Sequence, residues 1–345
     1  MSLGSERDGE IRSALGDDTP AKVVVRVLIV GSAHPWRMER AVERALRRAG
    51  HTTLLLDDRR LKRRMGKALT QLWVEKRAAG FKADFVFLSK CLALNLGTVS
   101  RLIEGRDNAM WYHDPQWHRD LHRPDIAHIA AVGRLAKTFF ITGFANEWRA
   151  HGLRAMLLPA AGDSSIAPEP HNPRFAADVT FIGTGYDPER AKFLMEVAKR
   201  HQVRVWGLGW ERWARELNWG GRAVEADEFE AVCSSSKITL GVNPARAAGA
   251  STYTSDRTWM VLLAGAFLLT PGTPGMKRML RGGEHCAWYE DIDSCLSQIR
   301  YYLDHDVDRK RIQAAGTQFA RRFHTYDQRI DNLLAHREFV NPGDE

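Results

Sequence analysis

The sequence predicts an α/β protein built from two Rossmann-like domains, whose parallel sheets face each other across a cleft. Three observations lead to this expectation. The chain has 345 residues, and two domains of roughly 150 residues each are natural for that length. Apolar, strand-like segments alternate with helical segments throughout the chain. The alternation stops once, at a segment rich in proline, serine and glycine, and then starts again.

The first domain is expected over residues 21–161. Its opening segment, 23–31 (VVVRVLIVG), is β-branched and almost continuously apolar, which is typical of a parallel strand buried on both faces. The helix expected at 37–49 carries apolar residues at helical spacing and ends at Gly50. Further strands are predicted at 52–58, 84–90, 108–114, 137–143 and 154–160, and further helices at 61–79 and 96–104.

The second domain is expected over residues 176–325, after a linker at 162–175. Its strands are predicted at 177–185, 203–209, 237–243 and 266–272, and its helices at 188–200, 228–236 and 257–265. A final helical region is expected from about 292 to 336, with residues 326–345 forming a terminal helix and tail. Open parallel sheets bind ligands at the carboxyl ends of their strands, so the cleft between the sheets is the expected site.

The composition excludes several classes of protein. Hydrophobic residues make up 44% and charged residues 27% of the chain, as in ordinary globular proteins. The longest apolar stretch, 259–269, is too short to span a membrane, and the polar residues 1–20 are expected to form a disordered leader without the features of a secretory signal. The four cysteines form no CxxC pair, and scattered thiols of this kind suit a cytoplasmic location.

The positive charge is concentrated in one part of the first domain. Residues 37–77 hold 13 Lys and Arg against 5 Asp and Glu, an excess that equals the net charge of the whole chain, +8. Two interpretations remain open. One is that the patch is a set of solvated helix faces, and the other is that it attracts a polyanion such as nucleic acid, an acidic membrane surface or a phosphorylated glycan.

A short glycine loop is the first candidate binding feature of the second domain. Gly183, Thr184 and Gly185 follow a predicted strand and precede a predicted helix, where backbone N–H groups can bind a phosphate. Arg190, just inside that helix, could neutralise a diphosphate. The alternative is a tight turn between strand and helix with surface charges beyond it, because neither a full GxGxxG motif nor a P-loop lysine is present.

A second glycine-rich loop follows the next strand, in the sequence WGLGW at 206–210. The indole of Trp206 could support a nucleobase, with Gly207 letting the ring pack closely. A role for this tryptophan in filling the core is an equally good interpretation. Asn243, which ends the predicted strand at 237–243, is placed with the same group of nucleotide-binding residues.

Several ordered motifs resemble one family. The segment SDRTWMVLLAGAFLLT (255–270) is similar to the "R-x-F-E … A-x-G … L-L-T" block of CgeB-like glycosyltransferases, which belong to the glycosyltransferase group 1 superfamily. Residues 282–316 resemble that family's "G-x-E-x-x-x-Y-x-D … I-x-Y-Y-L … I-x-x-x-G" tail, and FIGTGYDPER resembles the opening of its C-terminal domain. The resemblance covers nearly all of 177–330 and, loosely, the first domain.

The resemblance implies a GT-B fold and a glycosyltransferase that moves a sugar from a nucleoside-diphosphate donor to an acceptor in the interdomain cleft. It implies that the C-terminal domain holds the donor, of UDP or GDP type, with Gly183 and Arg190 facing the diphosphate and Arg257 in the helix that meets the nucleotide. The class usually needs no bound metal, and the sequence offers no metal-ligand cluster.

The chain departs from the family block at one position. The family has a glutamate, which holds the nucleotide ribose, where this chain has Met260. A thioether cannot accept those hydrogen bonds from the ribose. Either another group such as Asp256 replaces the glutamate, or donor binding is altered or lost.

Three residues of the first domain are candidates for the base that an inverting transferase needs on the acceptor hydroxyl. Asp114 and His113 lie at the end of a predicted strand, and His34 lies in the first strand-to-helix loop. A structural or surface role is the alternative for each of them.

Two other functions remain open. The chain could be a catalytically degenerate GT-B binding module, which Met260 favours, or a protein that binds a polyanion or nucleic acid through its basic face at 37–77. A Rossmann oxidoreductase is disfavoured because residues 31–34 do not continue as a dinucleotide fingerprint. An anionic glycan, a lipid-linked glycan and RNA are all compatible acceptors, and a place at the membrane surface is compatible with the charge.

Overall fold

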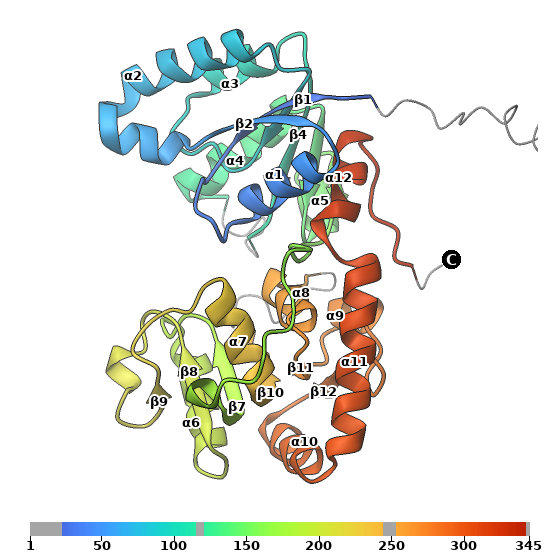
Figure 1. Cartoon of the computed structure of the whole chain (residues 1–345). Coiled ribbons are helices and arrows are strands. Elements are labelled where there is room, and N and C mark those ends of the chain that lie inside the picture. Colours follow the sequence, from blue (N-terminus) through green and yellow to red (C-terminus); the bar gives the residue numbers. More distant parts are fainter. Residues whose placement is uncertain (1–22, 115–120, 244–252, 343–345) are drawn as a thin grey trace, which may run out of the picture.

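The computed structural model describes residues 23–114, 121–243 and 253–342, and it contains two α/β domains stacked one above the other (Figure 1). The expected leader at 1–20 lies outside the described residues. Each domain is built on a six-stranded sheet in which all the paired strands are parallel. The predicted fold class is therefore confirmed.

The first sheet has the strand order β2-β1-β3-β4-β5-β6. Its strands are β1 (Arg26–Val30), β2 (Thr52–Leu56), β3 (Phe85–Leu88), β4 (Asp107–Tyr112), β5 (Thr138–Ile141) and β6 (Ala155–Leu157). Its helices are α1 (Met38–Arg48), α2 (Asp58–Phe81), α3 (Leu96–Ile103), α4 (Pro124–Leu135) and α5 (Ala145–Ala150). Strands β3 and β5 are buried along their whole length, because helices cover both faces of the sheet. Helices α4 and α5 were not predicted from the sequence.

The second sheet has the order β12-β11-β10-β7-β8-β9. Its strands are β7 (Ala177–Ile182), β8 (Val203–Trp206), β9 (Asn218–Trp219), β10 (Ser236–Leu240), β11 (Leu268–Pro271) and β12 (Ala287–Tyr289). Its helices are α6 (Pro188–Ala198), α7 (Asp227–Ser235), α8 (Asp256–Leu263), α9 (Pro274–Met279) and α10 (Ile292–Asp304). The short edge strands β9 and β12 and helix α9 were not anticipated.

The final helical region is three helices rather than one continuous segment. Helix α10 is followed by α11 (Asp306–Phe323) and α12 (Tyr326–Leu334). A capping box between Thr325 and Gln328 starts α12. Helix α12 returns to the first domain and packs on α1, where Ile330 and Leu333 join the same buried cluster as Leu46 (Figure 1).

The chain crosses between the domains twice, and the two crossings are joined to each other. The N–H of Gly162 donates to the carbonyl of His324 over 3.0 Å, and the N–H of Tyr326 donates back to the carbonyl of Gly162 over 2.9 Å. The linker and the α11–α12 connection therefore behave as one short two-stranded junction.

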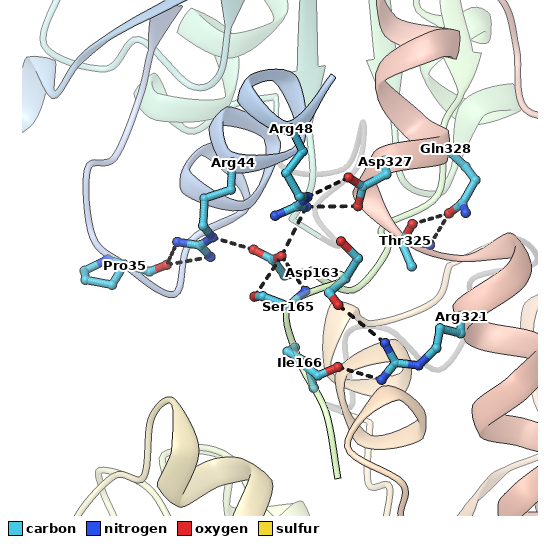
Figure 2. A network of polar contacts seen from close by, with 11 residues as sticks. Pro35, Arg44, Arg48, Asp163, Ser165, Ile166, Arg321, Thr325, Asp327 and Gln328 are labelled. Carbon is cyan, nitrogen blue, oxygen red and sulfur yellow. Dashed lines mark hydrogen bonds and ion pairs between the residues drawn. The ribbon is translucent and has the colours of Figure 1, made fainter. Parts of the chain in front are cut away.

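Asp163 holds this junction against the first domain (Figure 2). Its buried carboxylate pairs with Arg44 Nε at 2.5 Å and with Arg48 at 3.3 Å, both on α1. Arg48 also pairs with Asp327 of α12 at 2.8 Å. On the other side, Arg321 of α11 donates to the carbonyl of Ile166 over 2.8 Å. Charged groups from three segments thus fix where the junction lies.

A buried pair of basic side chains completes the junction. His324 is fully buried and stacks on Trp259 with ring centroids 3.9 Å apart. Its Nδ1 faces Arg329 Nη2 at 2.9 Å, and that guanidinium also donates to the carbonyls of Pro159 and Phe323. Burial, with a contribution from the Arg329 charge, holds the pKa of His324 well below its usual value.

Among the helices of the described ranges, none combines the length and the apolar character needed to cross a membrane.

We predict that Asp163→Asn lowers the free energy of unfolding by about 2 kcal/mol, because two guanidinium groups lose a buried carboxylate partner. Urea denaturation measures this change. Asp178→Asn is the matched control: its carboxylate pairs with Lys237 at the surface, and we expect a loss below about 0.5 kcal/mol there. Equal losses in the two variants would contradict the role given to Asp163.

We also predict an acid-sensitive stability that depends on His324. The folded pKa is depressed, so the unfolded chain takes up a proton first as the pH falls below about 6.5. The contribution of His324 to the free energy of unfolding is therefore fully present above that pH. Below it, the free energy of unfolding falls by up to about 1.4 kcal/mol per pH unit. His324→Gln, which keeps an acceptor for Arg329, should flatten this dependence in urea titrations from neutral to mildly acidic pH. The exposed His171→Gln serves as control, and a slope unchanged in His324→Gln would refute the assignment.

Candidate active site between the two domains

A cavity of about 760 Å³ lies between the two domains. The first domain and α12 line it with Arg37, Met38, His113, Asp114, Ala160 and Tyr326. The second domain lines it with Gly183, Thr184, Tyr186, Asp187, Pro188, Arg190, Tyr253, Ser255, Asp256 and Arg257. The carboxyl ends of β4 and β7 thus meet at one cavity, large enough for a small-molecule ligand.

The glycines of the β7–α6 loop serve the packing of two neighbouring loops. The N–H of Gly183 donates to the carbonyl of Trp206 over 2.8 Å, and that of Gly185 donates to Leu208 over 2.9 Å. A Cβ on Gly207, whose φ is +136°, would lie 2.0 Å from the carbonyl oxygen of Gly183. These two N–H groups are already used, so the expectation that they hold a phosphate is corrected: the glycines bring the loops together.

Two arginines face the cavity beside this loop. Arg257 donates to the carbonyls of Ile182, over 3.0 Å, and Val242, over 3.3 Å. Arg190 donates to the carbonyl of Thr184 over 2.9 Å. Their guanidinium carbons lie 4.9 and 5.4 Å from the centre of the Phe181 ring, so the ring lies close to both cations.

The Arg257 charge is held by backbone dipoles rather than by a carboxylate. Burial lowers the pKa of this guanidinium, which stays positive at neutral pH. A Cβ on Gly183 would lie 2.4 Å from Arg257 Nη1, so glycine makes the room for this side chain. Carbonyl oxygens leave the full positive charge to act on a bound anion.

Trp206 is part of the core and does not face the cavity. Only 2% of its surface is exposed. Its indole is covered by the Arg204 guanidinium at 4.4 Å, by the Phe175 ring at 5.6 Å and by the backbone at Gly220. The expectation that this ring supports a nucleobase is therefore wrong, because neither face of the indole is open to a ligand.

A second cavity of about 480 Å³ adjoins the first, with Arg190 lining both. It lies at the carboxyl ends of β10, β11 and β12, and Asn243, Phe193 and Tyr289 line it. The two aromatic rings are stacked with centroids 5.3 Å apart, and the Tyr289 hydroxyl donates to the carbonyl of Gly241 over 2.6 Å. This pair of rings, called here the aromatic wall, was not expected from the sequence, because β12, which carries Tyr289, was not predicted.

On the first-domain side, Asp114 and His113 lie side by side at the end of β4. The Asp114 carboxylate pairs with Lys90 at 2.5 Å and lies 3.8 Å from His113 Nε2. Nδ1 of His113 is buried and has no hydrogen-bond partner among the residues that the structure describes. The imidazole separates the large cavity from a third one of about 160 Å³, which it also lines.

The small third cavity contains a carboxylate that sequence reasoning missed. Glu39, in the first turn of α1, is buried, and its Oε1 accepts from the Ser89 hydroxyl over 2.7 Å. Its Oε2 has no partner within the described part of the chain. Burial raises the pKa of Asp58, which lines the same cavity. From the sequence, Glu39 was only one acid within a basic stretch.

His34 is not brought together with the other two candidate bases. It is exposed, and its Nε2 lies 3.9 Å from Glu225 of the second domain. It lines none of the three cavities described above. The structure therefore places His34 at the edge of the cleft, where it faces Glu225, and not beside Asp114 and His113.

Met260 and Asp256 lie one turn apart on α8. Met260 is partly buried and packs against the core of the second domain, away from the lining of the cleft. Asp256 lines the cleft, where its Oδ1 accepts from the N–H of Arg257 over 2.8 Å. Within the described ranges, no group of three His, Cys, Asp or Glu is placed to hold a metal ion.

One family model matches the chain, over residues 190–335, and it describes a glycosyl transferase-like family. The match covers most of the second domain together with α12, including Arg190, Asp256 and Arg257. A comparison with curated protein sequences finds no match.

Several solved structures share the arrangement of both domains. Alr3699/HepE from Anabaena, in complex with UDP, is 9% identical with a TM-score of 0.62, over 91% of this chain and all of that one. Sucrose-phosphate synthase from Thermosynechococcus elongatus is 10% identical with a TM-score of 0.64, over 90% and 98% of the two chains. An alpha-glucosyltransferase, in complex with UDP and a DNA 13-mer containing a HMU base, is 10% identical with a TM-score of 0.60, over 91% and 100%. The chain has the GT-B fold, and its residues 190–335 match the glycosyl transferase-like family model.

Proposed function

We propose that the protein is a glycosyltransferase that moves a sugar from a UDP-sugar to an acceptor bound on the first-domain side of the cleft. The observation that carries the proposal is the pair Arg190 and Arg257, which flank one ring at the carboxyl end of β7 and face the interdomain cavity. The family match over 190–335 supports the reaction class, and similar structures solved with UDP support the donor type. The ordered motifs between 177 and 330 favour the CgeB-like group.

The donor is proposed to lie along the second domain. The base occupies the cavity beside Phe193 and Tyr289, and Asn243 offers it an amide. The diphosphate lies between Arg190 and Arg257, at the place where the two cavities join. In this placement Asp256, which lines only the larger cavity, lies on the sugar side of the diphosphate rather than at the ribose.

The chemistry follows from the charges that line the cleft. The bond between the anomeric carbon and the β-phosphate oxygen breaks, and negative charge develops on the leaving UDP next to the two guanidinium groups. An acceptor hydroxyl forms the new bond to the anomeric carbon. We propose that Asp114, beside His113, accepts the proton of that hydroxyl.

A binding module without catalysis is the second candidate, and Met260 is the observation that favours it. Its thioether packs into the core, so it offers the ribose nothing. The two candidates differ in one measurable respect: both bind UDP, and only the enzyme releases UDP from a UDP-sugar.

We predict that UDP raises the melting temperature and that Arg190→Gln and Arg257→Gln each weaken UDP binding at least about tenfold, because each removes a charge-assisted contact to the diphosphate. Isothermal titration calorimetry measures the affinities. Lys192→Gln is the matched control, since Lys192 lies on the same helix, exposed and paired with Glu189. Arg257→Lys keeps the charge and should retain part of the affinity.

The nucleotide-binding proposal fails if a well-folded wild type shows no response to UDP, or if Lys192→Gln weakens binding as much as the cleft variants do.

We further predict that Asp114→Asn lowers the release of UDP from a UDP-sugar by a factor of about 100 or more, because the amide cannot take the acceptor proton. Calorimetry of UDP binding to the same variant serves as control and should give an affinity within about threefold of wild type. Normal turnover in this variant would remove Asp114 from the mechanism. No turnover in the wild type, with intact UDP binding, would favour the binding module.

A further inference from the structure

Helix α2 presents apolar side chains to solvent on the outside of the first domain. It is bent at Gly66, where φ is +80° and ψ is 170°. Beyond the bend, Leu69 is 58% exposed, Leu72 is 65% exposed and Trp73 is 36% exposed. At i, i+3 and i+4, these three side chains form one continuous strip, called here the apolar strip.

The same part of the helix buries polar residues. The Thr70 hydroxyl donates to the carbonyl of Gly66 over 2.7 Å. The Gln71 amide donates to the carbonyl of Ala93, and its oxygen accepts from the N–H of Asn95, both over 2.9 Å. Thr70 and Gln71 share the inward face of the helix with Val74 and Ala78, which are buried in the core, while Leu69 and Leu72 face solvent. The helix therefore carries a second apolar face in addition to the one that packs on its own domain.

The exposed surface around the apolar strip is strongly basic. The helix carries eight cations: Arg59, Arg60, Lys62, Arg63, Arg64, Lys67, Lys76 and Arg77. Arg59 and Arg63, before the bend, line the third cavity, and Lys67, Lys76 and Arg77 share the part beyond the bend with the apolar strip. The two acids of the helix do not balance the cations, because Asp58 is buried and Glu75 pairs with Arg101 at 2.6 Å. Within the described residues, none of the eight cations forms an ion pair with a carboxylate.

The position of α2 leaves this surface open. Figure 1 shows the helix at the outer edge of the first domain, with the part beyond the bend on the side away from the second domain. Arg77 lies over the Trp73 ring at 5.8 Å, so a cation stands directly beside the apolar strip.

We propose that α2 docks the first domain on a membrane surface that contains anionic lipids. Leucines and a tryptophan enter the boundary between headgroups and acyl chains, while the surrounding cations meet the lipid phosphates. Charge alone would suit nucleic acid equally well. The apolar strip decides between the two, because two aliphatic leucines gain nothing from a phosphate backbone in water but are stabilised by an acyl phase. This inference does not depend on the proposed function of the cleft.

Co-sedimentation of the full chain with vesicles tests the proposal. We expect binding to vesicles of phosphatidylcholine mixed with phosphatidylglycerol, and little binding to phosphatidylcholine alone. The double variant Leu69→Ser/Leu72→Ser should lose at least about tenfold in affinity, because it removes most of the apolar strip. Lys76→Gln and Arg77→Gln should each weaken binding about fivefold, in a salt-dependent way.

Val307→Ser is the matched control, because Val307 is an exposed aliphatic residue, at 83%, on α11 of the second domain. It should bind vesicles as the wild type does. The melting temperature of every variant, and its shift with UDP, should match the wild type, which separates a folding defect or a failure of the cleft from a failure of docking.

Three results would overturn the proposal. The first is vesicle binding that is unchanged in Leu69→Ser/Leu72→Ser. The second is tight binding to a single-stranded RNA homopolymer that the leucine variant retains, together with no binding to anionic vesicles. The third is a dimer in analytical ultracentrifugation that the leucine variant dissociates, because the apolar strip would then face a second copy of the chain.

Discussion

The junction of the two chain crossings determines how the two domains lie relative to each other. Two backbone hydrogen bonds join Gly162 to the segment before α12, and the Asp163 carboxylate ties that junction to α1. The cleft has walls from two separate cores, so its shape follows from how those cores are held. The buried Asp163 carboxylate between two arginines fixes the relative position of the two domains through directional contacts, whereas apolar contacts alone would be less directional.

Within the cleft, backbone hydrogen bonds also hold the positively charged side chain of Arg257 in place. Glycines at 183 and 207 bring the β7 and β8 loops into direct contact, and the Trp210 indole donates to the carbonyl of Gly183 over 2.7 Å. This packing gives Arg257 its place between two carbonyl oxygens. The loops are therefore rigid where the charge is presented, and preorganised charge interacts most strongly with a developing anion.

The sequence predicted the fold better than it predicted the site. Long apolar strands such as β1 and β7 are recognisable because burial on both faces leaves a continuous signal. The two- and three-residue edge strands β9 and β12 leave none, so the aromatic wall at Tyr289 was missed. Trp206 was ambiguous because an indole beside glycines suits a ligand and a core equally well. Only tertiary contacts could show that α2 turns Leu72 outward and Gln71 inward.

The return of α12 has a consequence for how the protein is made. The core of the first domain includes Tyr326, Ile330 and Leu333, which are synthesised after the entire second domain. During translation, the apolar surface of α1 around Val42 and Leu46 therefore stays uncovered by α12 until α12 has left the ribosome. The first domain thus begins to form before the second domain and is completed after it, and it is discontinuous as a unit of folding. The translation order makes the two domains interdependent before any ligand is present.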